Sequence, residues 1–144
     1  MLVHQILNSK SNHDVATILP GATVADAVEV LASRRIGALV VSVDGKVALG
    51  ILSERDVVRE LGRRGPACLT ETVEAMMTRD LVGCTRGDTA DAVLHRMTDG
   101  RFRHMPVIEA GQMVGLISIG DVVKARLMDL AAEKDALEGM IKGF

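Results

Sequence analysis

Residues 50–56 read Gly-Ile-Leu-Ser-Glu-Arg-Asp, and residues 115–121 read Gly-Leu-Ile-Ser-Ile-Gly-Asp. Each copy consists of a glycine, two aliphatic residues, a serine, two variable positions and an aspartate, and each is followed by Val-Val. The two aspartates, Asp56 and Asp121, are 65 residues apart (121 − 56). Repetition at a fixed period indicates that one supersecondary unit occurs twice. We therefore expect two similar units, each with this motif where a strand becomes a helix.

The hydrophobic pattern around the motifs predicts the same order of elements in both units. In the first unit we expect a short helix at 3–7, a strand at 15–18, a helix from Thr23 capped with Asp26, a strand at 38–43, a turn at Asp44-Gly45, a strand at 47–52 and a helix at 54–63. In the second unit we expect a short helix at 71–77, a strand at 82–84, a helix at 90–98 capped by Asp88 and Asp91, strands at 105–108 and 113–117 around a turn at Ala110-Gly111, and a long helix after Ser118. The helix at 3–7 is grouped with the first unit, and the helix at 71–77 with the second.

The size of the units predicts how they pack. Neither half, at roughly 60 residues, is expected to bury enough apolar surface by itself. We therefore expect an α+β fold in which the two sheets pack face to face around a pseudo-two-fold axis, leaving matching clefts where strands end and helices begin. The expected divisions are a first repeat at 1–64 with the N-terminal helix, a linker at 65–71, a second repeat at 72–127 and a C-terminal helix extension at 128–144.

Composition excludes several classes of partner. The 144 residues carry a formal net charge of −2, and Phe102 and Phe144 are the only residues among Phe, Tyr and Trp. This favours neither nucleic acid nor an anionic membrane as partner. No apolar run approaches the ~20 residues of a membrane span, and residues 1–10 lack the apolar region of a signal peptide. Cys68 and Cys84 fit no disulfide framework or C-x-x-C spacing. We expect a soluble cytoplasmic protein.

The doubled motif and the element order resemble those of a tandem pair of cystathionine-β-synthase (CBS) domains. The segments Arg35–Val41 and Arg101–Val107, which precede the hairpins, carry the same resemblance, and it covers the chain from Val3 to about Leu127. It implies two βαββα-type repeats, a module that often dimerises into a flat disc, and clefts that bind adenine-containing ligands such as AMP, ADP, ATP, NAD or S-adenosylmethionine.

The motif serine and aspartate have two interpretations. Ser53 with Asp56, and Ser118 with Asp121, are placed as N-cap and N3 residues of helices, and such a capping box stabilises by about 1 kcal/mol without any ligand. A helix N-terminus with free amides also suits a phosphate. The CBS resemblance implies that the aspartate contacts ribose and that the serine contacts ribose or phosphate.

Three cationic side chains make the clefts unequal. Arg101, Arg103 and His104 lie on the strand approach of the second unit, where they either neutralise phosphate or serve as surface charge and a core histidine. Strand alternation sends Arg103 and Met105 to one face and His104 to the other. Arg55, inside the first motif, is available to either cleft. We group the three cations with Ser118 and Asp121, and we predict that this second cleft is the better nucleotide site.

The adenine is expected to lie between aliphatic side chains. Backbone groups at the ends of the first strands of each unit are candidates for its edge: Thr17-Ile18 and Cys84-Thr85. Candidate apolar walls are Ile36, Ala38, Met105 and Val107. The alternative for each of these residues, considered alone, is a position in the hydrophobic core without ligand contact.

The C-terminal helix carries a second pattern. Residues Val123, Leu127, Leu130, Lys134, Leu137 and Ile141 are spaced 4-3-4-3-4, a short heptad seam interrupted by a lysine. The helix either packs back on its own module or pairs with another subunit.

The sequence does not favour an enzyme. His4, His13, His95 and His104 show no triad or metal-ligand spacing, and we expect no catalytic residue and no metal. We predict a regulatory module without an obligatory cofactor, which binds AMP, ATP or NAD, forms a homodimer and acts on an effector protein. The alternatives are a ligand-free adaptor homodimer and, less favoured, a small enzyme.

Overall fold

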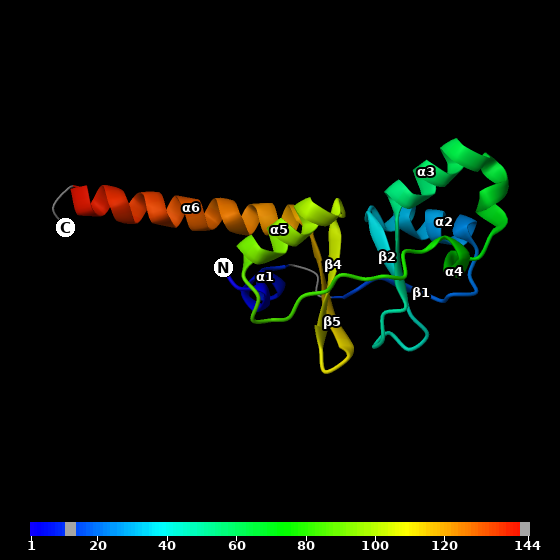
Figure 1. Cartoon of the computed structure of the whole chain (residues 1–144), viewed down its shortest axis with the longest axis horizontal. Helices are drawn as coiled ribbons and strands as arrows, with labels where there is room; N and C mark the ends of the chain where they lie inside the picture. Colours follow the sequence, from blue (N-terminus) through cyan, green and yellow to red (C-terminus); the bar gives the residue numbers. More distant parts are fainter. Residues whose placement is uncertain (11–13, 142–144) are drawn as a thin grey trace.

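The computed structural model describes residues 1–10 and 14–141, so His13 and Phe144 lie outside the described residues. The elements form two lobes (Figure 1). The first lobe contains β1 (Thr17–Ile18), α2 (Val24–Arg34), β2 (Ala38–Val41), β3 (Gly50–Ser53), α3 (Glu54–Arg64), the 3₁₀ helix η1 (Pro66–Thr70) and α4 (Val73–Met76). The second lobe contains α1 (Val3–Ser9), α5 (Ala90–Gly100), β4 (His104–Glu109), β5 (Gln112–Ser118) and α6 (Ile119–Ile141).

The sheets have the expected strand order, but several strands are shorter than expected: that at 15–18 begins at Thr17 and that at 38–43 ends at Val41. In the first lobe β1 pairs parallel with β2, and β2 pairs antiparallel with β3. The predicted strand at 47–52 begins only at Gly50, because the Asp44 carboxylate accepts hydrogen bonds from the backbone N–H groups of Lys46 and Val47 at 2.8 and 3.0 Å. These bonds make a wider loop instead of a two-residue turn. In the second lobe β4 and β5 form the predicted hairpin, but the predicted strand at 82–84 is reduced to one bridge, Cys84 with Val107.

The turn between β4 and β5 is confirmed at Ala110-Gly111. Both residues have positive φ, 52° and 79°. Two consecutive residues with positive φ are the requirement of a type I′ hairpin turn, whose twist matches that of the strands.

The grouping of the two short helices is wrong: each packs on the other lobe. Val3 and Ile6 of α1 are buried in the core of the second lobe, together with Met105 and Ile117. Residues of α4, including Val73, are buried in the core of the first lobe with Leu39. Backbone hydrogen bonds fix this arrangement, because Val3 N–H donates to Asp88 O at 2.9 Å and Val24 N–H donates to Glu71 O at 2.9 Å.

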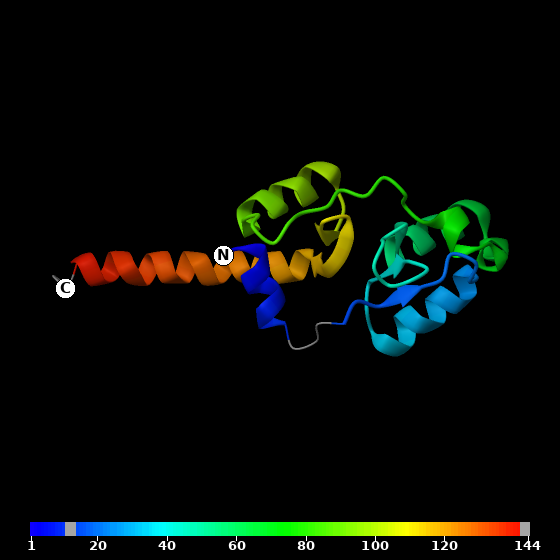
Figure 2. The ribbon, with the colours of Figure 1, turned by 90° about the horizontal axis from the view of Figure 1, so that it is seen from below.

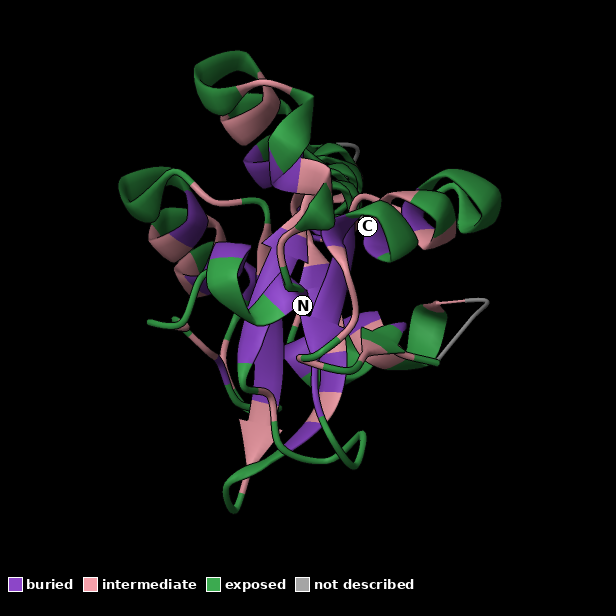
Figure 3. Cartoon of the chain, turned by 90° about the vertical axis from the view of Figure 1, so that its right-hand side faces the viewer, coloured by how far each residue is buried: buried purple, intermediate pink, exposed green. Residues whose placement is uncertain are grey.

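The two sheets pack against each other as expected. Alternation along β2 sends Leu39 and Val41 towards the helices of the first lobe, and Ala38 and Val40 towards the second lobe, where they meet Met113 of β5. Helices therefore lie outside and buried strands lie inside (Figure 3). The fold is α+β, with a long C-terminal helix that extends beyond the second lobe (Figures 1 and 2).

Candidate functional site: two clefts between the lobes

Both motifs form the predicted capping box. Ser53 Oγ accepts a hydrogen bond from Asp56 N–H at 3.2 Å, and Asp56 Oδ2 accepts one from Ser53 N–H at 2.9 Å. Ser118 and Asp121 make the same two bonds at 3.2 and 2.9 Å. The reciprocal pair satisfies one helix N–H and the N-cap N–H. In each case the aspartate is held at the start of a helix that follows directly from a strand.

The cap of α5 differs from the prediction. Its N-cap is Thr89, whose hydroxyl accepts a hydrogen bond from Ala92 N–H at 3.1 Å. The carboxylate of Asp88 is used elsewhere, because it accepts from Thr85 N–H at 2.8 Å and from Arg96 Nη1 at 3.0 Å. These bonds, that from Arg96 first, hold the pKa of Asp88 below its ordinary value.

The larger cavity, called the first cleft, lies between the first motif and the second lobe. It encloses about 660 Å³. The first motif contributes its serine, aspartate and Arg55, the second lobe contributes residues 100–104 and Pro106, and the connecting segment contributes Thr78, Asp80, Leu81 and Val82. Its cationic lining consists of Arg55, Arg59, Arg101 and Arg103, with His104 beside them.

The smaller cavity, called the second cleft, lies between the second motif and the first lobe. It encloses about 350 Å³ and is lined by Ser118 and Asp121. The first lobe and the segment before it contribute Asp14, Val15, Ala16, Arg34, Ile36, Gly37 and Ala38, and the end of α1 with the following residue contributes Leu7 and Lys10. The charged lining of the second cleft consists of two cations, Lys10 and Arg34, and two carboxylates, Asp14 and Asp121.

The grouping of the cations with the second motif is therefore wrong. Arg101 and Arg103 line the first cleft, and His104 lines both. The reason is the face-to-face packing of the lobes, which sets the strand approach of each lobe opposite the motif of the other. The premise on which the second cleft was favoured is thereby removed.

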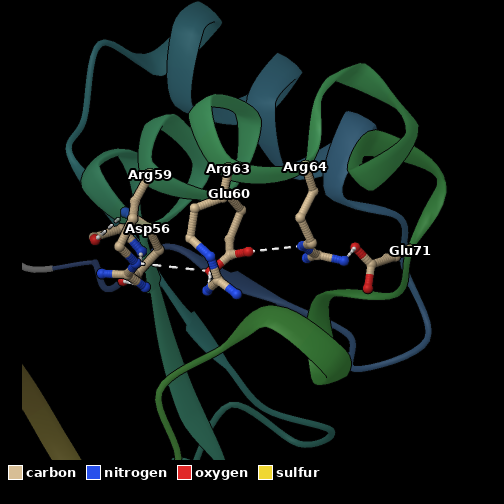
Figure 4. Close-up of polar contacts among 7 residues, drawn as sticks. Asp56, Arg59, Glu60, Arg63, Arg64 and Glu71 are labelled. Atoms are coloured by element: carbon tan, nitrogen blue, oxygen red, sulfur yellow. Dashed lines mark hydrogen bonds and ion pairs between the residues drawn. The ribbon is translucent and has the colours of Figure 1, made fainter.

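The aspartates of the two motifs have different ionic partners. Asp56 pairs with Arg59 of its own helix, with Arg59 Nη2 at 3.0 Å from Asp56 Oδ1 (Figure 4). The next acidic residue, Glu60, is paired with Arg64 at 2.7 Å and Arg63 at 3.2 Å. These arginines hold the pKa of Glu60 below its ordinary value, the hydrogen bond from Arg64 being the largest cause.

Asp121 is paired with a lysine from another element. Lys10 Nζ lies 2.9 Å from Asp121 Oδ2 and donates a second hydrogen bond to Leu116 O at 3.0 Å. Burial raises the pKa of Asp121, but the hydrogen bonds from Ser118 and Lys10 outweigh it, so that the pKa lies below its ordinary value. A ligand hydroxyl that binds Asp121 Oδ2 must therefore compete with Lys10.

The remaining predicted residues divide into two sets. Ile36 and Ala38 line the second cleft, and Arg55 lines the first. Met105 is fully buried in the second-lobe core, Ile18 packs on the first-lobe core, and Thr85 is exposed beside the buried Cys84. These last four line neither cleft.

The residues that line the clefts near the first strands lie slightly earlier in the chain than Thr17-Ile18 and Cys84-Thr85, which were predicted to contact the adenine. Leu81 and Val82 line the first cleft, and Val15 and Ala16 line the second. The members of these pairs are 66 residues apart (81 − 15 and 82 − 16), so the repeat spacing is the signal that could have found them.

Burial raises the pKa of the Cys84 thiol to about 11, which leaves little thiolate at neutral pH and disfavours a nucleophilic role.

No helix in the described part of the chain is long and apolar enough to cross a membrane. Among residues 1–10 and 14–141, no group of three or more His, Cys, Asp or Glu side chains is placed to hold a metal ion.

The comparisons with known proteins match both halves of the chain. The family model described as CBS domain matches residues 4–63 and 73–128. The mitochondrial CBS domain-containing protein CBSX3 of Arabidopsis thaliana is 36% identical over 125 residues, which are 84% of this chain and 61% of that protein. The chain thus spans less than two thirds of the length of that relative. The crystal structure of the CBS-domain protein ATU1752 of Agrobacterium tumefaciens is 42% identical, with a TM-score of 0.82, and 88% of this chain covers 99% of it.

Two more distant structures have a ligand or an assembly in their descriptions. The CBS domain pair of protein MJ0100, a fold likeness at 22% identity and a TM-score of 0.74 over 90% of this chain and 96% of that one, was solved with 5′-methylthioadenosine and S-adenosyl-L-methionine. A CBS-CP12 protein from bloom-forming cyanobacteria, 26% identical with a TM-score of 0.72 over 85% of this chain and 69% of that one, is described as hexameric.

Proposed function

Because this chain belongs to the CBS-domain family and contains two CBS repeats, we propose that it is a regulatory module that binds an adenine nucleotide (AMP, ATP or NAD) between its lobes. The observation that carries this proposal is the first cleft. It combines a capped aspartate at a helix N-terminus with four arginines around a cavity of about 660 Å³. That volume lies within the range of small-molecule sites, ~300–1,000 Å³.

Each part of a nucleotide finds a complementary group in the first cleft. The carboxylate of Asp56 accepts hydrogen bonds from ribose hydroxyls after Arg59, whose side chain is largely exposed, moves aside. Arg55, Arg101 and Arg103 supply guanidinium groups for phosphate oxygens. Leu81 and Val82 offer an apolar wall and backbone groups to the base. The ligand reported for the MJ0100 pair supports an adenosine compound as the class.

The second cleft is the weaker candidate in this proposal. It has about half the volume, and its motif aspartate is already neutralised by Lys10. Displacing Lys10 breaks its ion pair with Asp121 and its hydrogen bond to Leu116 O, and this loss subtracts from the binding free energy. We therefore expect the first cleft to bind the nucleotide more tightly.

Binding acts by shifting conformations. A ligand that contacts both lobes stabilises the arrangement of lobes, or of a homodimer, to which it binds better, and this differential affinity is the only source of the shift. The consequence is altered contact with an effector protein. This regulatory role is the general one of CBS pairs, and we do not assign a catalytic step.

The test compares two matched aspartate variants in ligand-free protein. Asp56→Asn and Asp121→Asn each remove one carboxylate from an equivalent capping box. Because Asp121→Asn also removes the ion pair with Lys10, the rise in melting temperature of each variant is measured against that variant's own ligand-free protein. At a nucleotide concentration of 100 Kd, binding stabilises wild-type protein by about 2.7 kcal/mol, which we expect as a rise in melting temperature of several degrees. Calorimetric titration gives the affinity directly.

The expected result is that Asp56→Asn loses most of the rise in melting temperature, whereas Asp121→Asn retains it. The reverse order would assign the nucleotide to the second cleft. If AMP, ATP and NAD all leave the melting temperature of ligand-free protein unchanged, the chain is the adaptor homodimer instead. Turnover of an offered nucleotide would support an enzyme.

A further inference from the structure

The second half of α6 leaves the body of the molecule with an apolar stripe uncovered. The helix has 23 residues and is therefore ~35 Å long, and only its first part lies beside α1 and α5 (Figure 2). The described stripe residues are substantially exposed: Val123 42%, Leu127 62%, Leu130 49%, Leu137 60% and Ile141 85%. Most of the stability of a helix in a protein comes from packing of its apolar face. An apolar stripe that packs on nothing within the chain therefore indicates a partner surface.

The stripe and the face that packs on the lobe are different faces of the helix. Val122 and Ala125 are buried in the second-lobe core. At 100° per residue, the centre of the stripe lies about a third of a turn around the helix from these two residues. The stripe therefore stays accessible while α6 remains docked, and it runs into the body at Val123.

The stripe has the spacing of a heptad seam, in which Leu127, Lys134 and Ile141 take a positions and Val123, Leu130 and Leu137 take d positions. A parallel pair of such helices sets each seam residue against its own copy, so that Lys134 meets the partner's Lys134. It also sets Glu133 against the partner's Glu138 on both sides. Three like-charged pairs oppose this arrangement.

An antiparallel pair of the same helices has complementary layers. Val123 meets the partner's Ile141, Leu127 meets the partner's Leu137, and Leu130 meets the stem of the partner's Lys134. Lys124 then lies opposite the partner's Glu138, twice by symmetry. One like-charged pair is left, Glu133 with the partner's Glu133, and the Lys134 ammonium groups lie beside it.

We propose that α6 forms an antiparallel helix pair with α6 of a second copy of this chain, centred between Leu130 and Lys134. The seam lysine selects this register, since it faces a leucine here and another lysine in the parallel pair. The inference names the surface of the homodimer in the proposed function, and it rests on that dimer but not on nucleotide binding. The two bodies lie at opposite ends of the pair.

Cysteine cross-linking distinguishes the two orientations in the full chain. Cys68 and Cys84 are buried, so wild-type protein supplies the background. Under mild oxidation we expect a mixture of Leu127→Cys and Leu137→Cys proteins to give a disulfide-linked dimer, because these positions share a layer. Each variant alone should give little, and Ala132→Cys on the outer face of the helix is the matched control. Cross-linking of Leu127→Cys with itself would overturn the antiparallel arrangement.

A charge exchange tests the register. Lys124→Glu places like charges opposite Glu138 twice, and we expect the dimer dissociation constant, measured by sedimentation, to rise about three- to tenfold. The double variant Lys124→Glu, Glu138→Lys should restore it. A dissociation constant insensitive to both changes, or a monomeric wild-type protein, would overturn the proposal. The nucleotide-induced rise in melting temperature of the same variants reports separately on the proposed ligand function.

Discussion

The side chain of His104 lies in the wall between the two clefts. Its Cε1 is 3.3 Å from where a Cβ on Gly37 would lie, so the backbone of the first lobe approaches the ring closely. The equivalent residue of the first repeat, 66 residues earlier, is Ala38. Burial lowers the pKa of His104, whereas the charges of Glu54 and Asp121 raise it, and Lys10 and Arg103 lower it further; the pKa lies below its ordinary value. The His104 imidazole is therefore mostly neutral at pH 7.

This histidine makes the stability depend on pH in a known direction. Because its pKa is lower in the folded than in the unfolded chain, the unfolded chain binds more protons between the two values. The free energy of unfolding should therefore fall as the pH decreases through ~6.5, by at most about 1.4 kcal/mol per pH unit for one group. Asp121, with its lowered pKa, acts only at more acid pH.

His104→Gln should flatten this dependence. Urea unfolding between pH 5.5 and 7.5 measures the slope in the wild-type and His104→Gln proteins. An equal slope in wild-type and His104→Gln protein would contradict the assignment.

At the scale of elements, the motif glycine permits a short helix, or the residues just after it, to pack closely against a strand. A Cβ on Gly50 would meet the Met77 side chain and would lie 2.8 Å from the backbone oxygen of Thr78, just after α4. A Cβ on Gly115 would lie 2.7 Å from Leu7 Cδ2, in α1. The same close approach thus occurs in both lobes, but the obstacle is backbone in the first and a flexible side chain in the second.

The two alanine variants should differ for that reason. Gly50→Ala should cost about 2–3 kcal/mol of unfolding free energy, near the upper end of overpacking costs, and Gly115→Ala about 1 kcal/mol because Leu7 can change rotamer. Denaturant unfolding measures both. Equal losses, or a larger loss for Gly115→Ala, would show that the Thr78 backbone yields more easily than this geometry indicates.

Local chemistry was predictable from the sequence, and the pairing of distant elements was not. The capping boxes at Thr23, Ser53 and Ser118 depend on residues three apart, which a sequence displays directly. The cap of α5 was misplaced by one residue because Asp88 and Thr89 are both good caps. The short helices were assigned to the wrong lobes. Neither sequence contains a pattern that favours the core of one lobe over the other, and the chain segments that connect each helix allow it to reach either lobe.

At the scale of the molecule, each cleft is a composite of both lobes. Ser53 and Asp56 meet Arg101 and Arg103 only because the sheets pack face to face. In the sequence these arginines precede the second motif, and proximity along the chain alone groups them with that motif. The family and the α+β class are confirmed. The fold places the predicted Arg55, Asp56, Arg101, Arg103, His104 and Asp121 in a cleft, but Lys10, Arg34 and Arg59 line the clefts without having been predicted.

The exchange of short helices predicts which lobe responds to a core deletion. Val3 of α1 and Val73 of α4 are both fully buried, so Val3→Ala and Val73→Ala each remove the same atoms at a cost of about 1–3 kcal/mol. Hydrogen exchange measured by mass spectrometry on the full chain should show faster exchange in α5, β4 and β5 for Val3→Ala. For Val73→Ala the faster exchange should lie in α2, β2 and β3, since each cavity weakens the cooperative unit that surrounds it. The opposite pattern would place each helix on the lobe that follows it in the chain.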